Sequence, residues 1–142
     1  MRIYESEGIG RVFILHLRKG DGVLEGIREV IAKYQLQNAV VVSGVGSLRQ
    51  LHYHFISSLA NVAEDQFDMA KNPIEMGAIQ GLIIESVPHL HVTASDPNRA
   101  YIGHLEPESE VQYLAEICIM ELKGADLTRR KDEFGVTYID KK

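Results

Sequence analysis

The residues with the clearest potential for chemistry are three histidines in the second half of the chain, in the segments Pro88-His89-Leu90-His91 and Gly103-His104-Leu105. Side chains two apart on a β-strand point to the same face, so His89 and His91 lie together if the first segment is a strand. Between the two segments, Asp96-Pro97-Asn98 is typical of a turn and predicts a β-hairpin.

Folding the hairpin about this turn brings the third histidine to the other two. If Asp96 pairs with Arg99, His91 lies directly opposite His104, and such residues have Cβ atoms about 4.5–5.5 Å apart. Three neutral imidazoles can bind one divalent cation, usually zinc, with a fourth position open for water or a ligand. An alternative stays open, because Pro97 does not suit the primed turns of tight hairpins. A one-residue slip would turn His104 to the other face and leave ordinary strand histidines.

Other residues that could do chemistry carry weaker signals. His52 and His54 repeat the two-residue spacing without a third partner nearby in sequence, so we expect a solvated or interface role for them. Glu116, on a neighbouring strand, is a candidate carboxylate to contact the metal-binding histidines. Gly44-Val45-Gly46 is followed by Arg49 where a dinucleotide fingerprint has its third glycine, which favours a tight turn.

The elements that must position the histidines are mainly strands. Apolar residues recur at helical spacing from Val23 to Tyr34, after Asp21 in the position of an N-cap, which predicts an amphipathic helix. Strands are expected at Arg11–Arg18, Asn38–Ser43, Leu51–Phe55, Pro73–Glu85, Pro88–Ser95, Arg99–Glu106 and, with a helix as the alternative, Val111–Leu122. We expect Gly44–Ser47 to interrupt the chain between two of these strands, and Ser57–Asn72 to be a loop or irregular segment.

This pattern predicts an α+β fold, a mostly antiparallel mixed sheet with one main helix packed on it. The early strand–helix–strand unit would add a parallel pair. Seven or so strands for one helix leave sheet surface uncovered in a single subunit, and self-association would cover it.

Composition limits the classes of protein that are possible. With 142 residues the chain has room for one domain, spanning residues 1–142 with a core at about 10–122 and a charged C-terminal segment at 123–142. Fifteen Lys and Arg against 20 Asp and Glu give a net charge of −5, unfavourable for gripping phosphate backbones. Apolar runs reach only about four residues, so no membrane span is expected. One cysteine, Cys118, excludes an internal disulfide and favours the cytoplasm.

Three segments together resemble the plant and prokaryote conserved (PPC) domain: Ala39–Leu48, Pro88–Val92 and Gly103–Leu105. The resemblance extends from the first strand to about Leu122. It implies an α+β fold that assembles as a homotrimer, with zinc as the usual ion on His89, His91 and His104. Plant members carry DNA-gripping AT-hooks beside this domain, but the Arg-Gly-Arg-Pro core of a hook is absent here. Asn72-Pro73-Ile74-Glu75 also replaces the Gly-Arg-Phe-Glu that is usual in the family.

The sequence thus predicts a metal-bearing homotrimeric assembly or binding module, with DNA or another protein as a further partner to be tested. The alternative is a small zinc-dependent enzyme in which a metal-activated water attacks the substrate.

Overall fold

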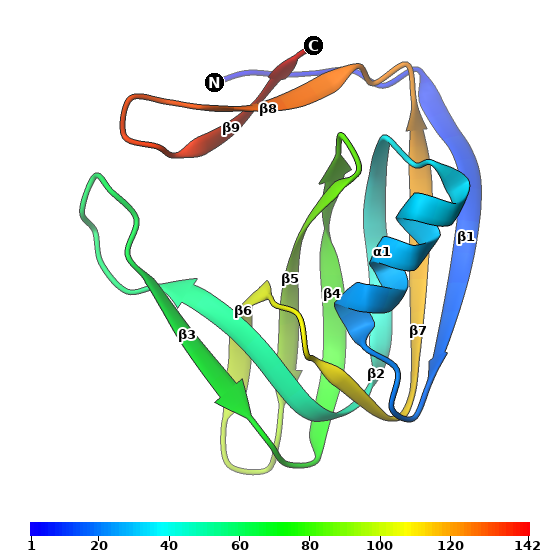
Figure 1. Ribbon diagram of the computed structural model, residues 1–142, viewed down its shortest axis with the longest axis vertical. Coiled ribbons are helices and arrows are strands. Elements are labelled where there is room, and N and C mark those ends of the chain that lie inside the picture. Colours follow the sequence, from blue (N-terminus) through cyan, green and yellow to red (C-terminus); the bar gives the residue numbers. More distant parts are fainter.

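The structure, a computed structural model, describes residues 1–142 and contains nine strands and one helix. In chain order these are β1 (Gly8–Arg18), α1 (Val23–Tyr34), β2 (Asn38–Ile56), β3 (Asp65–Ala70), β4 (Ile74–Ile84), β5 (Val87–Ser95), β6 (Ala100–Leu105), β7 (Glu110–Lys123), β8 (Leu127–Lys131) and β9 (Thr137–Lys141). Strands β1 to β7 form one curled sheet, and β8 and β9 form a separate hairpin (Figure 1). The helix is too short to cross a membrane.

The large sheet is antiparallel at every pairing. Its order is β1-β7-β2-β4-β5-β6, with β3 beside β2. The predicted parallel pair is therefore wrong. Strands β1 and β2 run in the same direction, but β7 lies between them and pairs antiparallel with both. The helix therefore connects two strands that are separated in the sheet by one other strand, β7.

Strand β2 organises the rest of the sheet because it is long enough to pair with four other strands. The expected interruption at Gly44–Ser47 does not occur, and the strand continues through it with irregular register. A Cβ on Gly44 would overlap the side chain of Ile79, and one on Gly46 would overlap the backbone at Leu114. These glycines therefore allow close packing within the sheet and do not end the strand.

The far end of β2 closes the sheet upon itself. It pairs with β3 on one side and with β6 on the other, so that Tyr53 lies opposite Leu105 and His54 opposite His104. The expectation of an irregular segment at Ser57–Asn72 is wrong for its second half, which forms β3. Its weak local pattern is overridden because the exposed edge of β2 supplies backbone partners.

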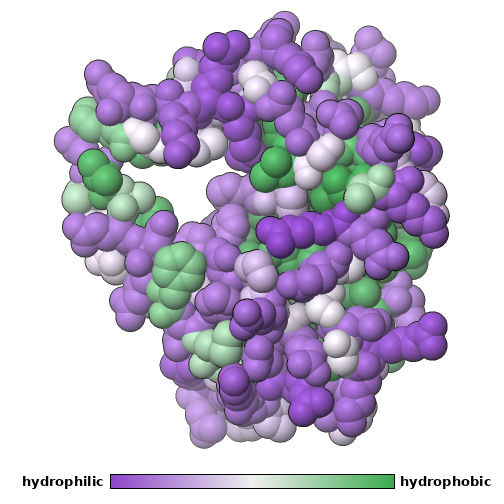
Figure 2. All heavy atoms as spheres, in the orientation of Figure 1, coloured by the Kyte–Doolittle hydropathy of each residue, from purple (hydrophilic) through white to green (hydrophobic).

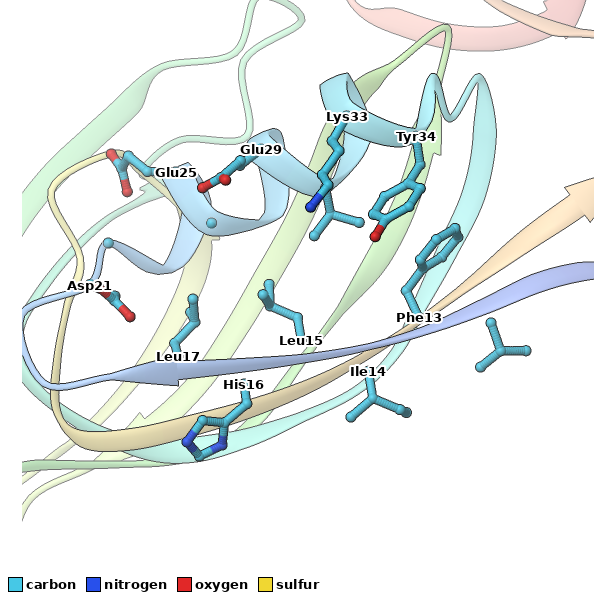
Figure 3. Close-up of a pocket in the computed structure, with 14 residues that line it drawn as sticks. Phe13, Ile14, Leu15, His16, Leu17, Asp21, Glu25, Glu29, Lys33 and Tyr34 are labelled. Atoms are coloured by element: carbon cyan, nitrogen blue, oxygen red, sulfur yellow. The ribbon is translucent and has the colours of Figure 1, made fainter.

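Helix α1 covers one face of the sheet near β1. It buries Val23, Leu24, Ile27 and Ile31, and Leu15 and Leu17 point toward it, whereas Ile14 and His16 point to the opposite side of β1 (Figure 3). The N-cap is Gly22 and not Asp21. The Asp21 carboxylate instead accepts a hydrogen bond of 2.7 Å from the backbone N–H of Arg18, which closes the turn before the helix.

The core consists of 25 buried residues contributed by the helix and the concave face of the curled sheet. Strands β5 and β6 take part in it through Leu90, Val92, Tyr101 and Leu105. Because side chains alternate along a strand, burial of these residues turns their neighbours outward.

We expect Gly103→Ala to destabilise the fold. Its added methyl group would overlap the backbone carbonyl oxygen of His54, where β6 meets β2. Backbone there cannot move aside easily, so the free energy of unfolding in urea should fall by about 1–3 kcal/mol. Gly77→Ala is the matched control, because the nearest atom to its new methyl, the carbonyl oxygen of Thr93, lies 3.8 Å away. Equal stability of the two variants would contradict the closure of β2 on β6.

Candidate metal centre

Strand β5 presents two histidines on the outer face of the curled sheet. Its burial alternates, with Leu90, Val92 and Ala94 at 1%, 0% and 4% exposure, whereas His89 and His91 are exposed. The pattern follows from the period of two along a strand, since the apolar side chains occupy the core. The expectation that His89 and His91 share a face is confirmed.

The turn between β5 and β6 sets the position of His104. The Asp96 backbone N–H donates to the carbonyl oxygen of Arg99 at 3.0 Å, and the Asp96 carboxylate accepts from the backbone N–H groups of Asn98 and Arg99 at 2.7 and 2.9 Å. The hydroxyl of Tyr101 donates to the same carboxylate at 2.5 Å. This register places His91 directly opposite His104, as predicted, and the slipped alternative does not form.

The carboxylate that closes this turn is held firmly in its ionised form. The hydrogen bond from Tyr101, together with those from the backbone N–H groups, lowers the pKa of Asp96 to about 2. Hydrogen bonds to a carboxylate favour its charged form, so the turn keeps its acceptor under all ordinary conditions. Asn72 donates a further hydrogen bond to the same group.

The three imidazoles converge. The ring centroids of His89 and His91 are 5.5 Å apart, and His104 lies 4.8 Å from the first and 5.7 Å from the second. One ring nitrogen from each histidine can be chosen so that all three lie within 4.8 Å of one another. Zinc binds imidazole nitrogen at about 2.0–2.1 Å, and three histidines are a known protein ligand set for it. The donor set therefore fits a divalent metal.

A fourth histidine and a carboxylate adjoin this cluster. The ring of His54 stacks on His104 with centroids 4.6 Å apart, and its Nδ1 is 2.6 Å from Oε1 of Glu106. The other ring nitrogen of His54, Nε2, lies 3.9 Å from Oδ1 of Asp65. The expectation of a solvated or interface role for His52 and His54 did not include this contact of His54 with the cluster. His52 is not part of the cluster, and its Nδ1 lies 3.0 Å from the carbonyl oxygen of Pro107.

The sequence could not predict that His54 lies beside His104, because only the pairing of β2 with β6 brings these two residues together. The two-residue spacing of His52 and His54 resembles that of His89 and His91, but His52 and His54 do not share a metal-binding cluster. The structure also assigns a different carboxylate from the one expected. Glu116 lies on β7 opposite His16 of β1, and its Oε1 is 3.7 Å from Nδ1 of His16. It is therefore not at the histidine cluster. Glu106 is the carboxylate that contacts the cluster, through His54.

The surroundings favour neutral imidazoles, the form that binds metal. Partial burial lowers the pKa of His104 to about 4, and the nearby His89 and His54 act in the same direction. Desolvation also lowers the pKa of His89, with Arg129 as the next cause. Protons therefore compete weakly for these nitrogens near neutral pH.

A cavity of 880 Å³ opens beside the three histidines. Figure 2 shows the hollow between two projecting parts of the molecule, the β8–β9 hairpin and the connection from β2 to β3. The hairpin contributes Arg129 and Phe134 to the walls, and the connection contributes Val62. Residues 123–142, expected as a charged C-terminal segment, thus contain a strand pair that forms one wall of the cavity.

The chain belongs to the Plants and Prokaryotes Conserved (PCC) domain family, whose model matches residues 4–123. This confirms the family that the sequence motifs indicated. The β8–β9 hairpin lies outside the matched residues.

Solved structures share the fold. A plant- and prokaryote-conserved (PPC) protein from Pyrococcus horikoshii has a TM-score of 0.83 and 23% identity, covering 99% of this chain and 98% of that one. A metal-containing protein from Archaeoglobus fulgidus has a TM-score of 0.79 and 23% identity, covering 95% of both chains. A candidate DNA-binding protein from Bacteroides thetaiotaomicron has a TM-score of 0.74 and 19% identity, covering 98% of both. Likeness at these identities shows the fold alone.

A curated relative is the bifunctional protein GlmU of Synechococcus sp. (strain JA-3-3Ab), which is 28% identical over 123 residues. These residues make up 86% of this chain and 19% of GlmU, so the chain spans about a fifth of the relative's length.

The low pKa of His104 makes stability depend on pH. Between pH 6.5, the ordinary pKa of histidine, and about pH 4, His104 is protonated in the unfolded chain but not in the folded protein. The free energy of unfolding of the metal-free protein should therefore fall as the pH is lowered through this range, and His104 should add no slope above it. His104→Gln should flatten the slope in urea titrations between about pH 7.5 and about pH 4.5. The control His16→Gln, on β1, should retain it, and equal slopes for wild type and His104→Gln would overturn this interpretation.

Proposed function

We propose that the chain is a metal-binding homotrimeric module of the PPC type, in which His89, His91 and His104 hold one zinc ion. The observation that carries this proposal is the convergence of three ring nitrogens to within 4.8 Å on two paired strands. The metal-containing relative from Archaeoglobus fulgidus supports it.

The chemistry of the donor set favours zinc. Imidazole suits zinc well, and three protein ligands leave a fourth tetrahedral position for water or a ligand. Held by these histidines, zinc would supply a Lewis acid that lowers the pKa of a water in the fourth position. Of this chain's own groups, Glu106 orients His54, and His54 packs on the ring of His104, so this pair helps to fix the orientation of one ligand.

Metal analysis tests the site directly. The purified protein should bind about one zinc per chain, and His89→Ala, His91→Ala and His104→Ala should each weaken zinc affinity by at least about 100-fold, because two imidazoles hold the ion poorly. His16→Ala should retain the wild-type affinity. The measurement is a competition titration with a chromophoric chelator, accompanied by circular dichroism to show that each variant is folded. Equal zinc affinity in wild type and the three variants would refute the proposed site.

The homotrimer is supported by the sheet face opposite α1. This face exposes apolar side chains from three adjacent strands, with Ile14 at 74%, Val45 at 45% and Leu114 at 42% exposure. Ile14 points away from the helix (Figure 3). Such a surface is typical of a contact between subunits.

Sedimentation equilibrium should give three times the chain mass of 15.9 kDa. Ile14→Glu places a charge on the apolar face and should shift the protein toward smaller species, because burying an unpaired carboxylate is costly. Leu59→Glu is the control, since Leu59 is fully exposed in the connection between β2 and β3. A wild-type protein that is a stable monomer would refute the trimer.

A second candidate is a zinc-dependent enzyme, which the cavity beside the histidines favours. Its size lies within the range of about 300–1,000 Å³ that is typical of small-molecule sites. Zinc-dependent hydrolysis that disappears in folded His91→Ala would distinguish this activity from a binding role.

Association with DNA draws support from the Bacteroides thetaiotaomicron relative, whereas the net charge of −5 opposes it. A titration against duplex DNA decides the matter, since phosphate-driven binding weakens steeply as salt is raised.

A further inference from the structure

The cavity beside the histidines has apolar walls that face solvent. Ile56 and Val62 line it from the end of β2 and the connection that follows, Ile102 from β6, and Phe134 and Val136 from the β8–β9 hairpin. Their exposed fractions range from 45% for Val136 to 65% for Ile56. Apolar side chains gathered around a concave polar site are typical of pockets for small organic ligands.

One cation at this cavity has no anionic partner within the protein. Arg129 of β8 lines the cavity and is partly buried, and its Nε is buried without a hydrogen-bond acceptor. The adjacent Arg130 differs, because it forms an ion pair with Asp140 at 3.4 Å. Arg129 also lies near enough to His89 to contribute to the lowered pKa of that imidazole. A partly desolvated guanidinium without a partner favours an incoming anion.

The charges around the cavity indicate how many negative charges that anion carries. Asp65 lines the cavity, and Glu106 is hydrogen-bonded to His54, which also lines it. A divalent ion on the histidines and the guanidinium of Arg129 together carry three positive charges. The carboxylates of Asp65 and Glu106 carry two negative charges, which leaves a net charge of +1. A monoanion balances this charge, whereas a phosphate monoester of about −1.5 to −2 would exceed it.

We propose that the cavity binds a small organic monocarboxylate, with its carboxylate at the Arg129 and histidine end and its apolar body against Ile102, Phe134 and Val136. This inference rests on the proposed function for the metal, and it adds the class of ligand. The β8–β9 hairpin, which lies beyond the residues matched by the family model, supplies the arginine and part of the apolar wall.

Calorimetric titration with phenylacetate tests the proposal, because this probe joins one carboxylate to one apolar ring. Zinc-loaded wild type should bind it saturably, and the uncharged analogue phenylacetamide should bind at least about tenfold more weakly. Arg129→Gln should weaken phenylacetate binding by a similar factor while the zinc content stays unchanged. Lys131→Gln removes the same charge from an exposed position on the same strand and should bind phenylacetate as wild type does.

Failure of this inference is distinguishable from failure of the metal site. If zinc is bound but phenylacetate does not saturate, or if Arg129→Gln binds it as wild type does, the ligand class is wrong and the metal site stands. If the wild type binds no zinc, the metal site fails, and the same titration of metal-free wild type and Arg129→Gln judges the role of the arginine alone.

A second copy of the chain is the competing occupant of the cavity. Phe134→Ser should leave the sedimentation mass unchanged and weaken phenylacetate binding, because it removes part of the apolar wall. A decrease in mass would instead identify the cavity as a contact between subunits and overturn the proposal.

Discussion

The carboxylate of Asp96 is the group on which the histidine cluster most depends. By accepting hydrogen bonds from the backbone of Asn98 and Arg99 and from the hydroxyl of Tyr101, it fixes the turn that joins β5 to β6. A shift of one residue in that turn would send His104 into the core side of the sheet and bring a different side chain opposite His91. The position of the His104 ring, eight residues after Asp96, is thus set by hydrogen bonds at the turn.

The second constraint is the curl of the sheet, which brings the end of β2 against β6. Gly103 permits this contact because a side chain there would meet the backbone of His54. As a result, His54 and Glu106 stand beside His104, and the walls of the cavity partly desolvate the imidazoles. Desolvation lowers the pKa of His104, so that this nitrogen is available to a cation without displacing a proton. Fold and site chemistry are connected through this junction.

Local patterns were sufficient to predict the helix, the β5–β6 hairpin and the common face of His89, His91 and His104, because each depends on periodicity or on turn residues close in sequence. They were insufficient for the course of β2 through Gly44–Ser47, where glycines serve close packing with distant residues. They also missed β3 and the place of His54, since both depend on pairing between segments far apart in the chain. Glu116 was expected at the site from its strand, but the order of strands in the sheet places Glu106 there instead.

The most direct test of the account is the zinc K-edge X-ray absorption spectrum of the zinc-loaded protein. Three imidazoles from two paired strands predict a first shell of nitrogen and oxygen at about 2.0–2.1 Å, with the multiple-scattering signal of three histidine rings. In the His104→Ala protein, that signal should decrease to two rings. A wild-type spectrum showing one ring or none, or a sulfur scatterer at about 2.3 Å, would contradict the shared site.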